Sequence, residues 1–147
     1  KNLATLVRAT TKPIVVVGPA GWGDTGGIHA DHVRFLGYVP GADLPALYAN
    51  ASVFCMPSLW EGFGLPVAEA LVQGTPVVTS ERSSMAEITG DAAVLVDPRS
   101  VDSVAAGIDE AVGRRAELAE AGPRRAAGFT WSHTATLVLD AYREAAA

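Results

Sequence analysis

Apolar residues along the chain gather in five short runs rich in Val, Ile, Leu or Phe, without strict alternation of apolar and polar positions. Such runs are typical of strands in a parallel sheet that is covered on both faces. The pattern therefore predicts five such strands. They are PIVVVG (Pro13–Gly18), VRFLGY (Val33–Tyr38), ASVFCMPS (Ala51–Ser58), TPVVTS (Thr75–Ser80) and AAVLVDP (Ala92–Pro98).

Helical periodicity occupies most of the intervals between these strands and the whole of the chain after the last one. The predicted helices are Asn2–Ala9, Asp43–Asn50, Leu65–Gln73, Ser84–Thr89, Val101–Val112, Arg115–Ala127 and Trp131–Ala146. Strands that alternate with helices imply an α/β fold with right-handed crossovers. We therefore expect a Rossmann-like parallel sheet with helices on both faces.

The chain opens on KNLATLVRAT, which has the pattern of an amphipathic helix and not that of a signal peptide. In a doubly wound sheet a strand precedes the first helix and lies near the centre. We therefore expect the first strand to be missing and the natural protein to continue upstream of Lys1. A complete sheet without an empty central position would contradict this expectation.

Length and composition fit one domain over residues 1–147, with 49% apolar and 18% charged residues. No apolar run approaches the ~18 residues of a membrane span. The net charge of −5 argues against binding to nucleic acid, which needs a basic face. Cys55 is the only cysteine, so no disulfide can form within the chain. This favours a reducing compartment, and we expect a cytoplasmic protein in which Cys55 is a core residue.

Two other patterns carry weaker signals for chemistry. GWGDTG (Gly21–Gly26) follows a predicted strand and fits the G-x-G-x-x-G dinucleotide fingerprint. The next strand begins too soon for the helix that this fingerprint needs, so a loop is favoured. His29 and His32 offer two ligands where a metal site needs three or four, and we expect no metal.

The stretch EGFGLPVAE (Glu61–Glu69) places two carboxylates around a glycine-rich turn at the start of a predicted helix. The stretch follows a strand, so it lies at the edge where parallel sheets bind ligands. Glycine allows a tight turn and a close approach to a ligand, and Pro66 suits the first helical turn. Free amides at the positive end of the helix dipole would then form an anion site. The expected free amides are those of Phe63, Gly64, Leu65 and Val67.

The two acids occupy different places relative to this anion site. Glu61 precedes the helix, whereas Glu69 lies about 6 Å along the helix axis from its first turn. A carboxylate accepts two hydrogen bonds and therefore matches a vicinal diol. Two such acceptors around a diphosphate cradle suit a nucleotide-sugar, which carries ribose at one end and a sugar at the other. The alternatives are acids that only complement the helix dipole, or the acid and base of a glycosidase.

The same stretch resembles a family signature. The spacing E-x7-E after a strand ending in P-S is similar to that of the retaining glycosyltransferases of family GT4, which have the GT-B fold. The resemblance covers nearly the whole chain and corresponds to the C-terminal, donor-binding half of such enzymes. The matching blocks are KNL, VRFLGYV, DLPALYANASVFCMPSLWEGFGLPVAEALVQGTPVVTS, DAAVLVDP and FTWSHTA.

The resemblance implies a role for each matching residue. Glu61 would hold hydroxyls of the donor sugar as the catalytic residue, and Glu69 would hold the ribose. Lys1 would reach the diphosphate, and Tyr38 and Val39 would lie along the base. Backbone amides of the turn would bind the sugar and the distal phosphate. These amides belong to Gly62, Phe63, Gly64 and Leu65.

The resemblance also implies the partners of this domain. A nucleotide-diphosphate-sugar would be the donor, an N-terminal GT-B domain would adjoin the site, and no divalent metal would be needed. The acceptor, whether a sugar, a lipid or a small molecule, stays open, as does a peripheral position at a membrane. Two alternatives remain: a GT-B nucleotide-sugar binder or epimerase without transferase activity, and an NAD-binding Rossmann domain that uses GWGDTG.

Overall fold

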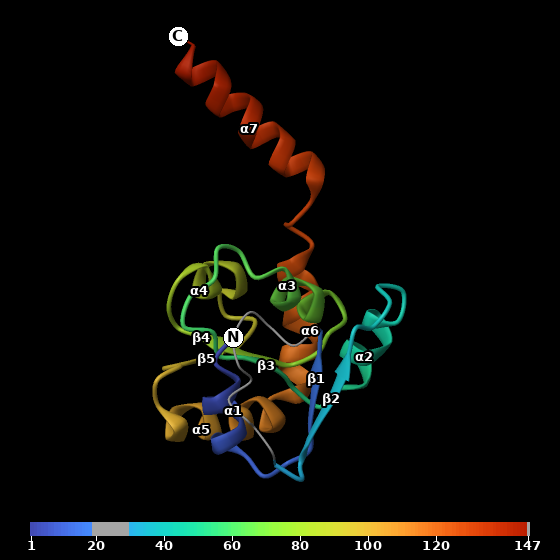
Figure 1. Ribbon diagram of the computed structural model, residues 1–147. Helices are drawn as coiled ribbons and strands as arrows, with labels where there is room; N and C mark the ends of the chain where they lie inside the picture. The colour runs from blue at the N-terminus through green and yellow to red at the C-terminus, as the bar shows by residue number, and fades with distance from the viewer. Residues whose placement is uncertain (19–29, 147) are drawn as a thin grey trace.

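A computed structural model describes residues 1–18 and 30–146 (Figure 1). Each predicted strand and helix is present, and the strands are shorter than predicted because they end where pairing with a neighbour ends. The elements are α1 (Leu3–Ala9), β1 (Ile14–Val17), β2 (Val33–Gly37), α2 (Leu44–Asn50), β3 (Phe54–Met56), α3 (Leu65–Val72), β4 (Val77–Ser80), α4 (Ser84–Thr89), β5 (Val94–Val96), α5 (Val101–Gly113), α6 (Arg115–Ala126) and α7 (Trp131–Ala145).

All strand pairs are parallel, as the alternation of strands and helices predicted. β1 pairs with β2, with Ile14 opposite Val33. β4 lies between β3 and β5 in a second sheet. GWGDTG and His29 lie outside the described residues, so the dinucleotide hypothesis is not tested by the fold.

Helices cover both faces of the three-stranded sheet, which confirms the predicted layering (Figure 1). Val77 and Val78 are consecutive residues of the central strand and are both fully buried. Val77 points into a cluster with side chains of α3 and α4, whereas Val78 points into one with side chains of α1 and α5. Burial on both sides explains why the strand sequences are uniformly apolar.

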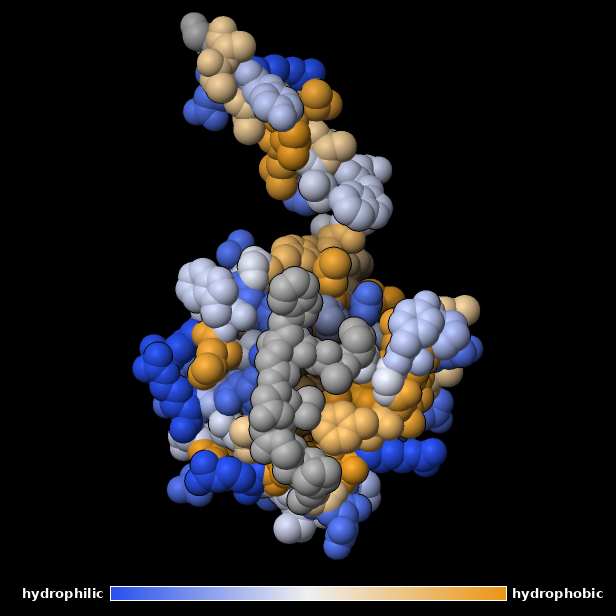
Figure 2. All heavy atoms as spheres, viewed as in Figure 1, coloured by the Kyte–Doolittle hydropathy of each residue, from blue (hydrophilic) through white to orange (hydrophobic). Residues whose placement is uncertain are grey.

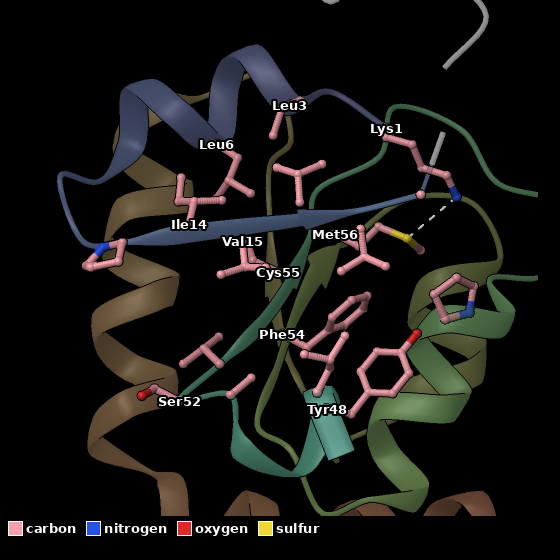
Figure 3. A pocket seen from close by; sticks show the side chains of 18 of the residues that line it. Lys1, Leu3, Leu6, Ile14, Val15, Tyr48, Ser52, Phe54, Cys55 and Met56 are labelled. Atoms are coloured by element: carbon pink, nitrogen blue, oxygen red, sulfur yellow. Dashed lines mark hydrogen bonds between the residues drawn. The ribbon is translucent and has the colours of Figure 1, made fainter. Parts of the chain in front are cut away.

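The two sheets are separated by an apolar cavity of about 760 Å³, which β1 and β3 both line (Figure 3). Ile14 and Val15 border it from β1, and Phe54 and Cys55 border it from β3. No pairing joins these two strands within the described residues. The sheet is therefore not complete and continuous, as expected for a Rossmann-like domain in which one central strand is not among these five.

α7 extends away from the body of the domain, and none of its described residues is buried (Figures 1 and 2). The side chain of Thr130 caps the helix by accepting a 3.1 Å hydrogen bond from the amide of His133. Among the described helices, none is both long and apolar enough to cross a bilayer.

A close approach between α5 and the second sheet generates a test of the packing. A Cβ at Gly107 would lie 2.3 Å from Cγ1 of Val96, so Gly107→Ala forces the helix off the sheet. We expect a loss of roughly 1–3 kcal/mol in the free energy of unfolding, measured by urea denaturation. Gly113→Ala is the matched control, because a Cβ there meets nothing within 4 Å. Equal effects of the two substitutions would contradict this packing.

Candidate functional site

The turn between β3 and α3 depends on one glycine. Gly64 has φ of 96°, in the left-handed region, and immediately precedes α3. The backbone angle therefore favours glycine, and a Cβ there would also lie 2.3 Å from Cε of Met85, the end of a flexible side chain that would have to shift. At Gly62, by contrast, a Cβ would meet nothing within 4 Å. The turn is therefore packed against α4 at Gly64 and open at Gly62.

Two serine hydroxyls, one at the end of β4 and one at the start of α4, hold the backbone of this turn. The Oγ atom of Ser84, at the start of α4, lies 3.1 Å from the carbonyl oxygen of Glu61 and 3.2 Å from that of Phe63. A hydroxyl has one proton, so Ser84 donates it to either carbonyl. Ser80, at the end of β4, donates to the carbonyl oxygen of Ser58. The chain just before the turn is thereby bonded to the end of β4, and the turn itself is bonded to the start of α4.

Glu61 is an ionised acid in a mostly buried position. Its side chain is 18% exposed, and its Oε1 accepts hydrogen bonds from Lys1 Nζ at 2.8 Å and Ser58 Oγ at 2.9 Å. Burial acts to raise the pKa of Glu61, but the hydrogen bonds from Lys1 and Ser58 and the charge of Lys1 outweigh it. The pKa of Glu61 is therefore below its usual range.

Glu69 lies on the exposed side of α3 and has a neutral partner. The hydroxyl of Tyr48, on α2, donates a 2.8 Å hydrogen bond to Oε2 of Glu69. Burial first, and then the hydrogen bond and the charge of Glu69, raise the pKa of Tyr48, so it stays a donor at neutral pH. The Tyr48 ring packs edge-on against Phe54, with centroids 5.4 Å apart. The sequence contained no signal for this contact, because the two residues lie on different helices.

The cavity between the sheets brings four of the predicted site residues together: Lys1, Tyr38, Val39 and Glu69 all line it. Lys1 also reaches the sulfur of Met56, at 3.7 Å from Nζ (Figure 3). Lys1 thus connects this cavity with Glu61. The other predicted residues, those of the turn and the start of α3, lie outside the cavity lining. They are Glu61, Gly62, Phe63, Gly64 and Leu65.

The amides at the start of α3 differ in one respect from the prediction. The amide of Val67 donates to the carbonyl oxygen of Gly64 at 2.9 Å, so the expectation that it is free was wrong. The reason is that Gly64 caps the helix and its carbonyl accepts the first helical bonds. The amides of Phe63, Gly64 and Leu65 make no hydrogen bond within the described residues. The potential anion site is therefore smaller than predicted.

Other chemistry is less favoured by the geometry. Within residues 1–18 and 30–146, no three His, Cys, Asp or Glu side chains are grouped as metal ligands would be. Burial raises the pKa of Cys55 to about 12, so its thiol stays protonated at neutral pH and behaves as a core group.

Sequence comparison assigns the chain to a family. A model of the glycosyl transferases group 1 matches residues 29–125, and the chain belongs to this family, which is of the GT4 type. A curated relative, O-antigen chain mannosyltransferase B of Escherichia coli, is 40% identical over 141 residues. That match covers 89% of this chain and 37% of the relative. The chain thus spans well under half of the relative's length.

Solved structures show the same fold. Sucrose-phosphate synthase of Thermosynechococcus elongatus superposes with a TM-score of 0.78 at 25% identity, over 99% of this chain and 42% of that one. HepE of Anabaena, solved with UDP and glucose, superposes with a TM-score of 0.70 at 24% identity, over 84% of this chain and 38% of its own. Both likenesses confirm the Rossmann-like architecture of GT-B glycosyltransferases.

The environment of Glu61 predicts a pH dependence. Its pKa is lower in the folded state than in the unfolded state, where it is about 4.3. The stability that this adds is present above the unfolded pKa and is lost as pH falls through the folded pKa. We expect Ser58→Ala to raise the pKa of Glu61 in an NMR titration, to lower stability at neutral pH and to make the part of the stability that acid removes smaller. Ser132→Ala, on exposed α7, is the control; a wild-type Glu61 that titrates at or above its usual value would contradict the assignment.

Proposed function

We propose that this chain, over residues 1–147, is the donor-binding domain of a retaining glycosyltransferase. The enzyme would transfer a sugar from a nucleotide-diphosphate-sugar to an acceptor. The observation that carries the proposal is the ion pair between Lys1 and Glu61, beside the free amides before α3, with Glu69 one turn into the same helix. Membership of the group 1 family supports the reaction class. Support for retention comes from the E-x7-E resemblance alone.

The site residues divide the donor between them. Glu61 binds hydroxyls of the transferred sugar, and the amides of the turn 62–65 bind the sugar and the distal phosphate. Glu69 binds the ribose hydroxyls and remains oriented by Tyr48. Tyr38 and Val39 lie along the base, because they line the same cavity as Glu69. A carboxylate at each end fits a ligand with a diol at each end.

The charges suit the departure of a nucleoside diphosphate. The leaving group gains negative charge as the bond to the sugar breaks, and a cation with fixed amides stabilises that charge without reorganisation. Lys1 provides the cation and the N-terminus of α3 provides the dipole. Glu61 is already ionised, so it orients sugar hydroxyls and does not donate a proton. We propose that no divalent metal takes part.

The acceptor would bind beyond this domain. The chain covers 37% of the Escherichia coli relative, and we propose that an N-terminal GT-B domain completes the site. That relative is named for an O-antigen chain, whereas a relative from Salinispora tropica, also 40% identical, is named for D-inositol 3-phosphate, so the acceptor class stays open between a sugar chain and a small molecule. A cytoplasmic location, at a membrane surface if the acceptor is lipid-linked, fits a chain whose single cysteine cannot form an internal disulfide. Alone, this chain should bind donor without turning it over.

Calorimetry on the chain with GDP-mannose, UDP-glucose and NAD tests the proposal directly. We expect saturable binding of at least one nucleotide-sugar and none of NAD. Binding of NAD without either nucleotide-sugar would overturn the proposal in favour of a dinucleotide-binding domain. Epimerisation of the bound sugar by the full-length enzyme, without transfer, would favour the epimerase alternative.

Removal of each carboxylate should weaken the binding of a different part of the donor. Glu69→Ala should weaken binding of both the free nucleotide and the nucleotide-sugar by ~1–3 kcal/mol, from lost charge-assisted hydrogen bonds. Glu61→Ala should weaken the nucleotide-sugar but hardly change the free nucleotide. Both effects are measured by calorimetry, with Glu120→Ala on the exposed side of α6 as a control. Equal loss of free nucleotide in both variants would contradict the division of roles.

A further inference from the structure

An aromatic pair joins the turn to the chain segment between α6 and α7. The rings of Phe63 and Phe129 meet edge to face, with centroids 5.9 Å apart and an angle of 84°. This is a favoured geometry for aromatic pairs. Phe63 is 45% exposed and Phe129 is 40% exposed, so neither ring is held by enclosure in the core. Each ring is therefore held mainly by specific contacts.

Phe129 is held in turn by an arginine anchored on α4. The guanidinium carbon of Arg125 lies 5.3 Å from the centroid of the Phe129 ring, within cation–π distance. Nε of Arg125 donates a 2.8 Å hydrogen bond to the carbonyl oxygen of Ile88, and Nη2 donates to that of Glu87. A cation at these carbonyls complements the C-terminal end of α4. Phe129 is thus linked through Arg125 to the end of α4.

α4 consequently holds the turn in two ways. Ser84, the first residue of α4, bonds to the backbone of the turn. Arg125, on α6, bonds to a carbonyl near the end of α4 and supports the Phe129 ring that contacts Phe63. Phe63 is flanked by Gly62 and Gly64, and glycine loses more backbone freedom than any other residue when a turn is ordered. A ring fixed between two glycines restricts the peptide groups on both sides of it.

We propose that Phe129 is a positioning residue for the donor: it fixes Phe63 and so pre-orients the free amides of the turn. The inference rests on the proposed function, because those amides are the ones assigned to the sugar and the distal phosphate. Amides ordered before binding do not have to be ordered by the ligand, and this raises affinity. Phe129 is not among the residues that line the cavity or that bond to Glu61, so we propose that it acts through Phe63.

The test compares Phe129→Leu, which removes the ring, with Phe129→Tyr, which keeps it. We expect Phe129→Leu to weaken binding of GDP-mannose or UDP-glucose about three- to tenfold, the range that one aromatic pair contributes. Phe129→Tyr should keep the affinity of the wild type. In ¹⁵N relaxation, Phe129→Leu should lower the order parameters of the Gly62 and Gly64 amides. Phe63→Leu combined with Phe129→Leu should weaken binding no more than either alone, since both remove one contact.

Phe35→Leu is the matched control, because Phe35 is 45% exposed and lies on β2, away from the turn. A purely structural role for Phe129 would give the same affinity and glycine order parameters in Phe129→Leu as in Phe35→Leu, and that result would overturn the proposal. If the wild-type chain binds neither nucleotide-sugar, the proposed function fails. The order parameters then decide separately whether Phe129 fixes the turn.

Discussion

The left-handed backbone of Gly64 is the constraint on which the site depends. It lets the chain leave β3, reverse, and enter α3 while packed directly against Met85. An added Cβ would meet a steric cost in the left-handed backbone, and the end of the Met85 side chain would have to shift to make room for it. Because the chain reverses here, Glu61 lies before the helix and forms an ion pair with Lys1. Glu69 lies on the helix and accepts a hydrogen bond from Tyr48.

Glu61 and Glu69 have different hydrogen-bond partners, and this gives the two acids different chemical properties. Glu61 has a cation and a hydroxyl, which keep it ionised in a mostly buried position, whereas the partner of Glu69 among residues 1–18 and 30–146 is a neutral phenol. The general acid of a glycosidase needs a raised pKa, and that of Glu61 is lowered. Glu61 is therefore unsuited to be the general acid, and the placement of both acids on one turn and helix argues against a glycosidase pair. Two acceptors for hydroxyl groups remain the better interpretation.

Local patterns predicted the elements but not how they are joined. Val77 and Val78 are buried on opposite faces, so a plain apolar run was enough to indicate a covered strand. Pairing between strands leaves no such mark: an empty central position was expected from the opening helix, but its place between β1 and β3 is seen only in the structure. The partners of the acids, and the Phe63–Phe129 pair, join segments far apart in the chain. The amide of Val67 was misassigned because a carbonyl of the turn competes for it.

The separation of the two sheets also bears on the fit of the ligand. Tyr38 and Val39 follow β2 of the first sheet, whereas the turn and Glu69 follow β3 of the second. The cavity that Tyr38, Val39 and Glu69 line continues between β1 and β3 into the apolar interior, and the turn lies outside its lining. The base and the sugar of a donor would thus rest on different sheets, and the spacing of the sheets would set the span between them. A segment that paired with both β1 and β3 would fix that spacing, so under the proposed function sheet assembly and donor affinity would be linked.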